Sequence, residues 1–247
     1  MSGQTVFKRY ELKYMLSNKQ KEKIVSAMAQ YMKPDKYGKT IIRNLYFDTD
    51  TYLLIRRSIE KPTYKEKLRV RSYSSAQAES TVFVELKKKF KKVVYKRRVP
   101  LKNSEAMAWL KGENHPKENT QIVKEIDYFM QFYGALHPTV FLSYEREAYY
   151  SKDDTGFRVT FDDNILCRQD NLSLEAEPYG TPILPKDKVL MEIKCSGGIP
   201  LWMTEILSAE KIYKTPFSKY GTAYKTLIFP QNHKLNAYNM LEVTKNA

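Results

Sequence analysis

The feature that most constrains the fold is an alternation of apolar and polar side chains with a period of two residues, which recurs along most of the chain. Successive side chains of a β-strand point to opposite faces of a sheet, so this period predicts strands with one apolar and one polar face. The pattern predicts an α+β fold around a large antiparallel sheet or barrel. The alternating segments are 7–16, 41–48, 64–73, 81–89, 93–101, 139–150, 157–165 and 189–195.

Helical patterns occur between these strands and after them. Ser17 can cap the first helix, and Asn103 or Ser104 can cap the second. Gly134 is placed to end the third, and Pro200 opens the fourth in the first helical position. Helices are therefore predicted over residues 18–32, 105–111, 119–134, 200–211 and 217–228. All of these elements are expected to form one domain over 1–247, with a core of about 7–229 and a peripheral tail over 230–247.

The polar faces of several predicted strands carry the same kind of charge. Lys67, Arg69 and Arg71 share one face of segment 64–73, and Lys96 and Arg98 share one face of 93–101. An ordinary amphipathic strand exposes a mixture of polar residues to water, and any single strand here fits that description. Gathered on one sheet, cations ~7 Å apart would repel by roughly 2 kcal/mol per close pair at an effective dielectric constant of 20. Such a face is expected to be screened by water or neutralised by a polyanion.

The charge balance of the whole chain supports a polyanionic partner. The 247 residues include 42 Lys and Arg against 28 Asp and Glu, which gives a formal net charge of +14. An excess of this size predicts a nucleic acid, an anionic membrane or a phosphorylated substrate, without distinguishing among them.

The remaining composition excludes other classes of protein. Cys167 and Cys195 are too few for a disulfide framework or a cysteine-based zinc site, and we expect both to be reduced packing residues. The first residues lack the apolar core of a signal peptide, and no apolar run approaches the ~18 residues of a membrane span. We therefore expect a soluble cytoplasmic protein without a membrane segment.

Carboxylates occur within the basic faces at a regular spacing. Glu85 and Glu192 each lie two residues before a lysine, Lys87 and Lys194, and therefore on the same strand face as that lysine. A carboxylate on a phosphate-binding face can be a ligand of a hard divalent ion that bridges phosphate oxygens. It can equally form a plain salt bridge with the neighbouring lysine, and both interpretations remain open for each glutamate.

The segments described so far contain a set of motifs that resembles a known family. The motifs YELKY, LYFDTDTY, KLRVRSY, VFVELK, YKRRV, YEREAY, FRVTFD, VLMEIK, PLWMTEIL and FSKYGTAYK follow one another between Phe7 and Phe229. Their order resembles that of the VTC-domain polyphosphate polymerases, which belong to the triphosphate tunnel (CYTH-like) superfamily. The resemblance implies a closed tunnel of eight antiparallel strands with a basic interior, covered outside by helices.

The resemblance also implies an activity and a set of site residues. Members use ATP or another nucleoside triphosphate and a divalent ion, Mn²⁺ or Mg²⁺, to extend inorganic polyphosphate from an orthophosphate or pyrophosphate primer. The implied catalytic residues are Lys13, Arg69, Arg71, Glu192 and Lys219. The implied metal ligands are Glu192, Glu85 and Glu11. The implied phosphate or nucleotide ligands are Lys13, Arg69, Arg71, Lys87, Lys96, Arg98, Arg146, Arg158, Lys194 and Lys219.

One position departs from the hydrolytic branch of that superfamily. Hydrolases carry an ExExK motif on the first strand, whereas this chain has Arg9 where the first glutamate would lie, followed by Glu11 and Lys13. The loss favours a polymerase over a tunnel triphosphatase and weakens the case for Glu11 as a metal ligand.

Two other functions remain as alternatives to the polymerase. The first is a tunnel triphosphatase, and the second is a non-catalytic protein that binds polyphosphate or nucleic acid. The second alternative depends on the run 87–92, because a surface patch of lysines can contact phosphate groups whatever the sequence of the nucleic acid. If 82–99 is instead a β-hairpin, Lys88, Lys89, Lys91 and Lys92 belong to its turn, and nucleic acid is not the expected partner.

Overall fold

A computed structural model of the chain describes residues 10–91 and 93–230. Their strands are antiparallel and form one sheet with the order β1-β10-β8-β7-β3-β4-β5-β6, while β2 pairs with β7 and β9 pairs with β8. The strands are β1 (Tyr10–Ser17), β2 (Met32–Pro34), β3 (Thr40–Asp48), β4 (Tyr64–Ser72), β5 (Thr81–Phe90), β6 (Val93–Lys102), β7 (His137–Ser151), β8 (Arg158–Arg168), β9 (Thr181–Pro182) and β10 (Lys188–Cys195). Each of the predicted strands is present, and the predicted α+β tunnel fold is confirmed.

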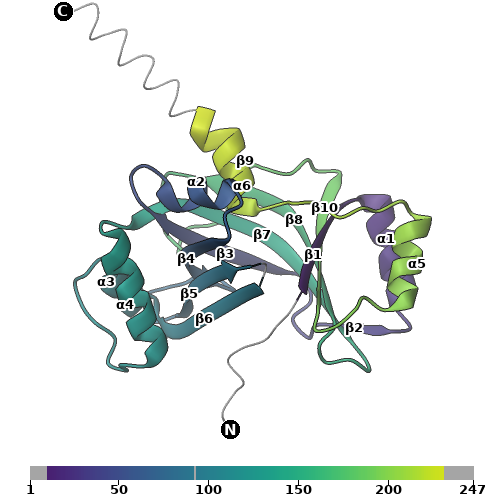
Figure 1. Ribbon diagram of the computed structural model, residues 1–247, viewed down its shortest axis with the longest axis horizontal. Helices are drawn as coiled ribbons and strands as arrows, with labels where there is room; N and C mark the ends of the chain where they lie inside the picture. Colours follow the sequence, from purple (N-terminus) through teal and green to yellow (C-terminus); the bar gives the residue numbers. More distant parts are fainter. Residues whose placement is uncertain (1–9, 92, 231–247) are drawn as a thin grey trace, which may run out of the picture.

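The sheet is strongly curved, so that its two ends approach each other. β4, β5 and β6 form one side of the curve, β8, β10 and β1 form the other, and β3 and β7 connect them (Figure 1). The hydrogen-bonded path begins at β1 and ends at β6, and no pairing between these two strands is found in the described residues. Side chains span the distance instead, because Lys87 Nζ on β5 lies 3.1 Å from a Glu11 carboxylate oxygen on β1. The concave side of this curve is called the inner face below.

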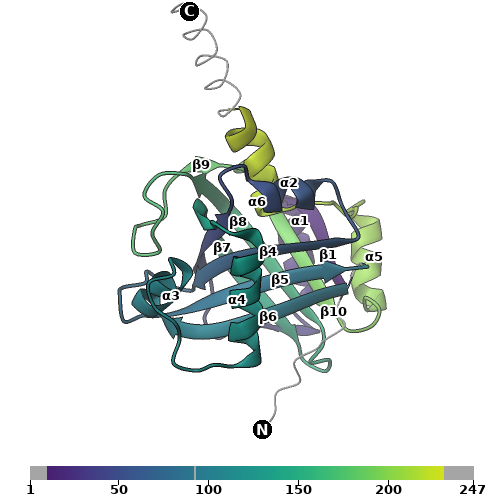
Figure 2. The same cartoon turned by 60° about the vertical axis from the view of Figure 1, so that its left-hand side comes forward.

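Helices cover the convex side of the sheet and one end of it (Figures 1 and 2). α3 and α4 pack on β5 and β6, while α1 and α5 pack beside β1 and β10. α2, α6 and the following π-helix η1 pack against the ends of β3, β4 and β7. The helices are α1 (Asn18–Met28), α2 (Leu53–Ile59), α3 (Asn103–Leu110), α4 (Gln121–Tyr133), α5 (Leu201–Ala209), α6 (Lys219–Ala223) and η1 (Tyr224–Ile228). None of these described helices has the length and apolar character needed to cross a membrane.

The helix ends follow the predicted capping signals in part. Ser17 caps α1 with a complete capping box, and Gly134 ends α4 with φ = 71°, a conformation that glycine adopts without strain. α3 begins at Asn103 itself, whose side chain donates to the Ala76 carbonyl and does not cap the helix. Pro200 is the cap of α5 and not its first residue.

Some element boundaries differ from the prediction because tertiary contacts override the local pattern. α1 ends at Met28, and Met32 instead begins β2, where it is buried in the core under α1 and α5. The short helix α2 has no predicted signal of its own. The predicted helix over 217–228 divides into α6 and η1.

The hairpin over 82–99 forms as predicted, but its turn is shorter. β5 continues to Phe90, so Lys88 and Lys89 belong to the strand, and Lys91 follows it. Lys88 faces the helix side, where its Nζ lies 3.5 Å from Glu125 of α4. Lys92 lies outside the described residues, as do the predicted strand residues 7–9, including Arg9, and the tail over 231–247.

Candidate functional site

The inner face carries the charged side chains that strand parity sorts to one side. On β4, Leu68 and Val70 are fully buried under the covering helices, while Arg69 and Arg71 face inward. On β5, Val84 and Leu86 are buried in the same core cluster. The fold is thus the reverse of a barrel with an apolar interior, because its apolar faces lie under helices and its polar faces lie inside. The predicted site residues then fall into three groups of ion pairs.

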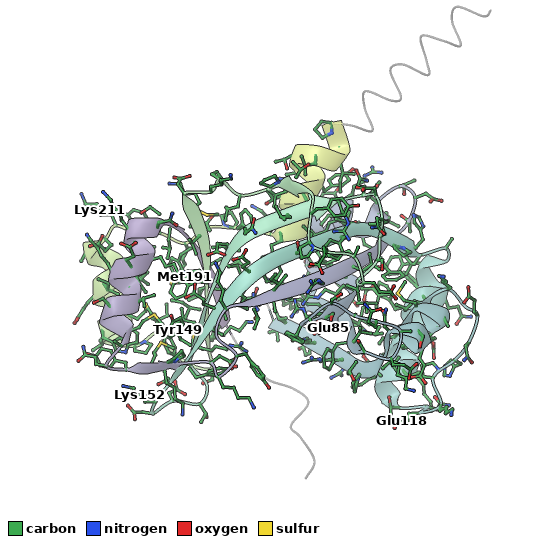
Figure 3. All side chains as sticks on the ribbon, turned by 180° about the vertical axis from the view of Figure 1, so that it is seen from behind. Glu85, Glu118, Tyr149, Lys152, Met191 and Lys211 are labelled. Atoms are coloured by element: carbon green, nitrogen blue, oxygen red, sulfur yellow. The ribbon has the colours of Figure 1, made fainter. Side chains whose placement is uncertain are left out.

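The first group surrounds Glu85, whose side chain is fully buried in the interior of the molecule (Figure 3). Arg69 donates to its Oε2 through Nε at 2.9 Å and through a terminal nitrogen at 2.8 Å. Lys96 Nζ lies 2.6 Å from Oε1, and the Nε atoms of Arg71 and Arg98 lie 3.8 and 3.7 Å from the carboxylate. Burial opposes ionisation of Glu85, but Arg69, Arg71 and Lys96 hold its pKa well below its usual range.

Glu85, on β5, therefore organises four cations from the two strands that flank it in the sheet, β4 and β6. Both of its oxygens already face positive charges. A metal ion at this carboxylate would therefore have to displace arginine and lysine side chains. Burial lowers the pKa of Lys96 to about 8, although Glu85 opposes this effect. The group therefore keeps an excess of positive charge that an anionic ligand could neutralise.

Aromatic hydroxyls on β3 and β7 orient the arginines of this group. Arg69 donates to the Tyr46 hydroxyl at 3.0 Å, and Arg71 donates to Tyr144 at 3.3 Å and to Asn44 Oδ1 at 3.0 Å. Burial opposes ionisation of Tyr144, but nearby cations, Arg71 among them, lower its pKa to about 8. These contacts fix the guanidinium planes, which can then bind phosphate in a bidentate manner.

The second group lies on the adjacent strands β1 and β10. Lys13 Nζ is 3.3 Å from Glu11 and 3.8 Å from Glu192, and Lys194 Nζ is 2.7 Å from Glu192. Burial opposes ionisation of both carboxyls. Lys87 and Lys13 nevertheless lower the pKa of Glu11 to about 2, and Lys194 and Lys13 hold the pKa of Glu192 well below its usual range. Both carboxylates are therefore ionised at neutral pH.

The third group joins β7, β8 and α6 through Asp162, a fully buried residue that sequence reasoning did not include among the site residues. Arg146 donates to its two carboxylate oxygens at 2.6 and 2.7 Å, and Lys219 Nζ donates to Oδ2 at 2.5 Å. Burial opposes its ionisation, but Arg146 and Lys219 lower its pKa to about 2. The sequence feature that could have identified Asp162 as a site residue is its position on the polar face of β8.

Arg158 lies at the end of β8 next to β10, opposite Lys194 in register, and outside these three groups. Its guanidinium lies 4.7 Å from the centre of the Tyr150 ring. Its Nε is buried without a hydrogen bond in the described part of the chain, as is the hydroxyl of Thr160, which pairs with Glu192 in register. These two unsatisfied polar groups are available to a ligand on the inner face.

The three glutamates predicted as metal ligands do not converge. Glu11 and Glu192 share Lys13, whereas Glu85 belongs to a different group. Within residues 10–91 and 93–230, no three His, Cys, Asp or Glu side chains gather closely enough to form a metal site by themselves. Two ionised carboxylates on neighbouring strands nevertheless fit an Mg²⁺-like ion, which is commonly held by one or two carboxylates together with substrate phosphates.

Comparison with known proteins places this arrangement in a family. A family model described as the VTC domain matches residues 8–228. The chain belongs to the VTC domain family. The matched range contains every site residue predicted above and ends at Ile228, the last residue of η1. No curated protein matches the sequence.

One solved structure supports the fold assignment for this VTC domain. A crystal structure from Bacillus halodurans, described as "a putative adenylate cyclase", aligns with a TM-score of 0.53 and 16% sequence identity, covering 87% of this chain and 96% of the other. A structure from Vibrio parahaemolyticus with the same description has a TM-score of 0.46 and 10% identity, covering 89% of this chain and 98% of the other. The Bacillus structure shows that the two chains share a fold.

Proposed function

We propose that this VTC domain is a polyphosphate polymerase that transfers the γ-phosphate of ATP to the end of an inorganic polyphosphate chain. The observation that carries the proposal is the convergence of arginines and lysines from β1, β4, β5, β6, β7, β8, β10 and α6 on one inner face. Membership of the VTC family supports the same reaction. Phosphoryl transfer suits such a face because it depends mainly on positioning and on stabilising charge at non-bridging oxygens.

The groups around Glu85 and Asp162 would hold the phosphates. Arg71 is buried and Arg69 is partly buried, and both are oriented by hydrogen bonds and able to contact two oxygens each. Lys219, at the start of α6, would contact the same phosphates from the opposite side of the sheet's curve. In the reaction, a terminal oxygen of the acceptor phosphate forms a bond to the γ-phosphorus, the bond from that phosphorus to the β–γ bridging oxygen breaks, and ADP leaves.

Glu11 and Glu192 would hold a divalent ion, Mn²⁺ or Mg²⁺, against the triphosphate. When bound, such an ion neutralises charge on the phosphate oxygens. Without it, the negative carboxylates would repel those oxygens. Lys13 and Lys194 keep both carboxylates ionised, and they would contact phosphate oxygens once the carboxylates turn to the metal. Glu85 is left out of this proposed metal site because four cations already surround it.

The proposal is tested by incubating the full chain with ATP and Mn²⁺ and separating the products on a polyacrylamide gel stained for phosphate polymers. A polymerase yields long polyphosphate with a matching amount of ADP. Orthophosphate alone would identify a tunnel triphosphatase, and a cyclic nucleotide with pyrophosphate would identify a cyclase. Binding of polyphosphate without any turnover would identify a non-catalytic binder.

Variants separate the inner face from the outside of the molecule. Replacing Arg69 by alanine removes an inner-face phosphate ligand and leaves Glu85 with one fewer partner, so synthesis should fall by at least two orders of magnitude, the scale found for loss of one electrostatic stabiliser. Lys124 is exposed on α4, and its replacement by alanine should leave synthesis unchanged. Equal loss in both variants would contradict an active site on the inner face.

A further inference from the structure

Lys67 differs from most of the inner-face lysines because it has no acidic partner. It lies on β4 between Lys65 and Arg69 and is directly opposite Lys87 of β5 in the register. Its Nζ donates to the Ser218 hydroxyl at 3.3 Å and lies 5.7 Å from the centre of the Tyr220 ring. No carboxylate of the described chain lies within 4.0 Å of this nitrogen.

Five other inner-face lysines are each paired within that distance, whereas Lys65, on the same face of β4, donates to the Ser58 carbonyl. Lys13 and Lys87 contact Glu11, and the further pairs are Lys96 with Glu85, Lys194 with Glu192 and Lys219 with Asp162. Lys67 is therefore a partly buried lysine whose charged neighbours are cations.

The elements packed around Lys67 supply mostly positive charge. Lys65 and Arg69 come from its own strand, Lys87 from β5 and Lys13 from β1. On β3, the carboxylate of Asp48 is engaged elsewhere. It accepts hydrogen bonds from the backbone amides of Leu54 and Ile55 at 2.8 and 3.0 Å, and from the Tyr220 hydroxyl at 3.0 Å. At the start of α6, the hydroxyl of its N-cap Ser218 and the Tyr220 ring lie next to Lys67.

This environment disfavours the charged form of the amine. Burial, followed by repulsion from Lys87, Lys65 and Lys13, lowers the pKa of Lys67 to about 7. Above that pH the free protein holds Lys67 mostly as a neutral amine. A phosphate chain on the inner face reverses the balance because it brings several negative charges to a site that lacks them, and it then stabilises the ammonium form.

We propose that Lys67 couples the binding of a phosphate chain to the uptake of one proton from solvent. The inference rests on the proposed function in so far as phosphate chains bind on the inner face. In the step, the neutral Lys67 amine takes a proton from the buffer, and the resulting ammonium donates hydrogen bonds to phosphate oxygens, with no change in any covalent bond of the chain. Binding of substrate is then favoured as pH falls from 9 toward 7.

The experiment is isothermal titration calorimetry of the full chain with tripolyphosphate at pH 8, in EDTA and in several buffers of different ionisation enthalpy. The slope of the observed enthalpy against the buffer enthalpy gives the number of protons taken up. Replacing Lys67 by arginine keeps a positive charge at the site but removes the titration, because arginine does not lose its proton in proteins. The K67R variant should take up about one proton fewer than the wild type.

The same variant should flatten the pH dependence of binding. A linkage of one proton changes Kd by about tenfold per pH unit above the pKa of the free group. Between pH 8 and 9, the Kd of the wild type should therefore rise by about tenfold more than the Kd of K67R. Protonation of tripolyphosphate itself is common to both proteins and cancels in the comparison. K124R, on the outer surface of α4, is the matched control and should behave as the wild type.

Lys96 is the rival assignment, because its pKa also lies near the pH of the experiment. If K96R loses the proton uptake and K67R keeps it, the proposal for Lys67 is overturned. Equal proton uptake in the wild type and K67R overturns it as well. If the wild type does not bind tripolyphosphate at all, the proposed function fails together with the inference, which distinguishes that outcome from a failure of Lys67 alone.

Discussion

At the scale of single residues, Glu192 separates binding from turnover. Its carboxylate contacts Lys194 and Lys13, and we assign it to the divalent ion. Replacing it by glutamine removes one negative charge from a phosphate-binding face, so tripolyphosphate should bind as tightly as in the wild type or more tightly. Synthesis from ATP and Mn²⁺ should fall by at least a hundredfold, because loss of one such electrostatic contact costs at least that factor.

Two measurements check the Glu192 prediction, tripolyphosphate affinity by calorimetry and polymer yield on a gel. Glu210 provides the control, because it pairs with Lys23 on the outer side of the molecule. E210Q should change neither quantity. Undiminished synthesis by E192Q would remove Glu192 from the reaction, and a loss of binding would show that its role is to position Lys13 and Lys194.

Glu85 should matter more for stability than for metal binding. Replacing it by glutamine leaves Arg69, Arg71, Lys96 and Arg98 near one another without their shared counter-charge. Breaking a buried ion pair on one side costs about 3–5 kcal/mol of unfolding free energy. Urea denaturation should show that loss for E85Q, whereas E79Q, at an exposed pair with Lys102, should cost well under 1 kcal/mol.

A polyanion should restore part of the stability that E85Q loses. Tripolyphosphate can neutralise the four released cations, so it should raise the melting temperature of E85Q by more than that of the wild type. Sodium chloride at the same ionic strength serves as the control for screening. A larger effect of tripolyphosphate on the wild type would show that Glu85 does not substitute for a bound phosphate.

The residues that sequence alone could assign are those whose role depends on strand parity. Arg69 and Arg71 face inward because they alternate with Leu68 and Val70, and that alternation is visible in the sequence. The partner of a charge is not visible in this way. Asp162 binds Lys219, which is 57 positions away on a helix that packs against the sheet, so its role follows only from the folded arrangement.

At the scale of secondary-structure elements, α1 is a helix whose first turn is fixed by its own sequence. Ser17 Oγ accepts from the Gln20 backbone amide at 3.2 Å, and the Gln20 side chain accepts from the Ser17 amide at 2.9 Å. Replacing Ser17 by alanine should lower the unfolding free energy by about 1 kcal/mol. Synthesis should be unaffected, because α1 lies on the convex side of the sheet.

The check on α1 is the urea midpoint of S17A together with its polymer yield. S26A is a matched control, because Ser26 is exposed within the same helix and alanine has the higher helix propensity. It should leave the midpoint unchanged or raise it slightly. A reduced yield in S17A at a temperature where it is fully folded would contradict the assignment of α1 to a purely structural layer.

Elements without a local signal depend on contacts that the sequence does not display. The backbone amides at the start of α2 are satisfied by Asp48, at the end of β3, and not by a cap of the usual kind. α2 is also only seven residues long, too short for a helical period to be recognised. The eight long strands, in contrast, repeat a period of two over eight residues or more, so their facing was predictable. β2 and β9, with three and two residues, are too short to show that period and were not predicted.

At the scale of the whole molecule, the inner face is held together by a few ionised carboxylates among many cations. The pKa of Asp162 is about 2 in the folded protein, compared with 3.8 for an unperturbed aspartate, and that of Glu11 is about 2, compared with 4.5. Both values are lowered on folding, so both groups stabilise the fold above their unfolded pKa. That stabilisation is lost as the pH falls through the folded value. Protonation then leaves Arg146, Lys219 and Lys87 repelling their neighbours.

The protein should therefore unfold more easily between pH 4.5 and 2. For Asp162 the shift corresponds to about 2 kcal/mol. Urea denaturation at a series of pH values should show the wild type losing stability across this range, while D162N starts about 2 kcal/mol lower at pH 6 and meets the wild type near pH 2. D153N, at an exposed position, should follow the wild-type curve throughout. Parallel curves of unfolding free energy against pH for D162N and the wild type would mean that Asp162 is not the ionised centre of its group. The inner face would then need another source of negative charge to hold Arg146 against α6.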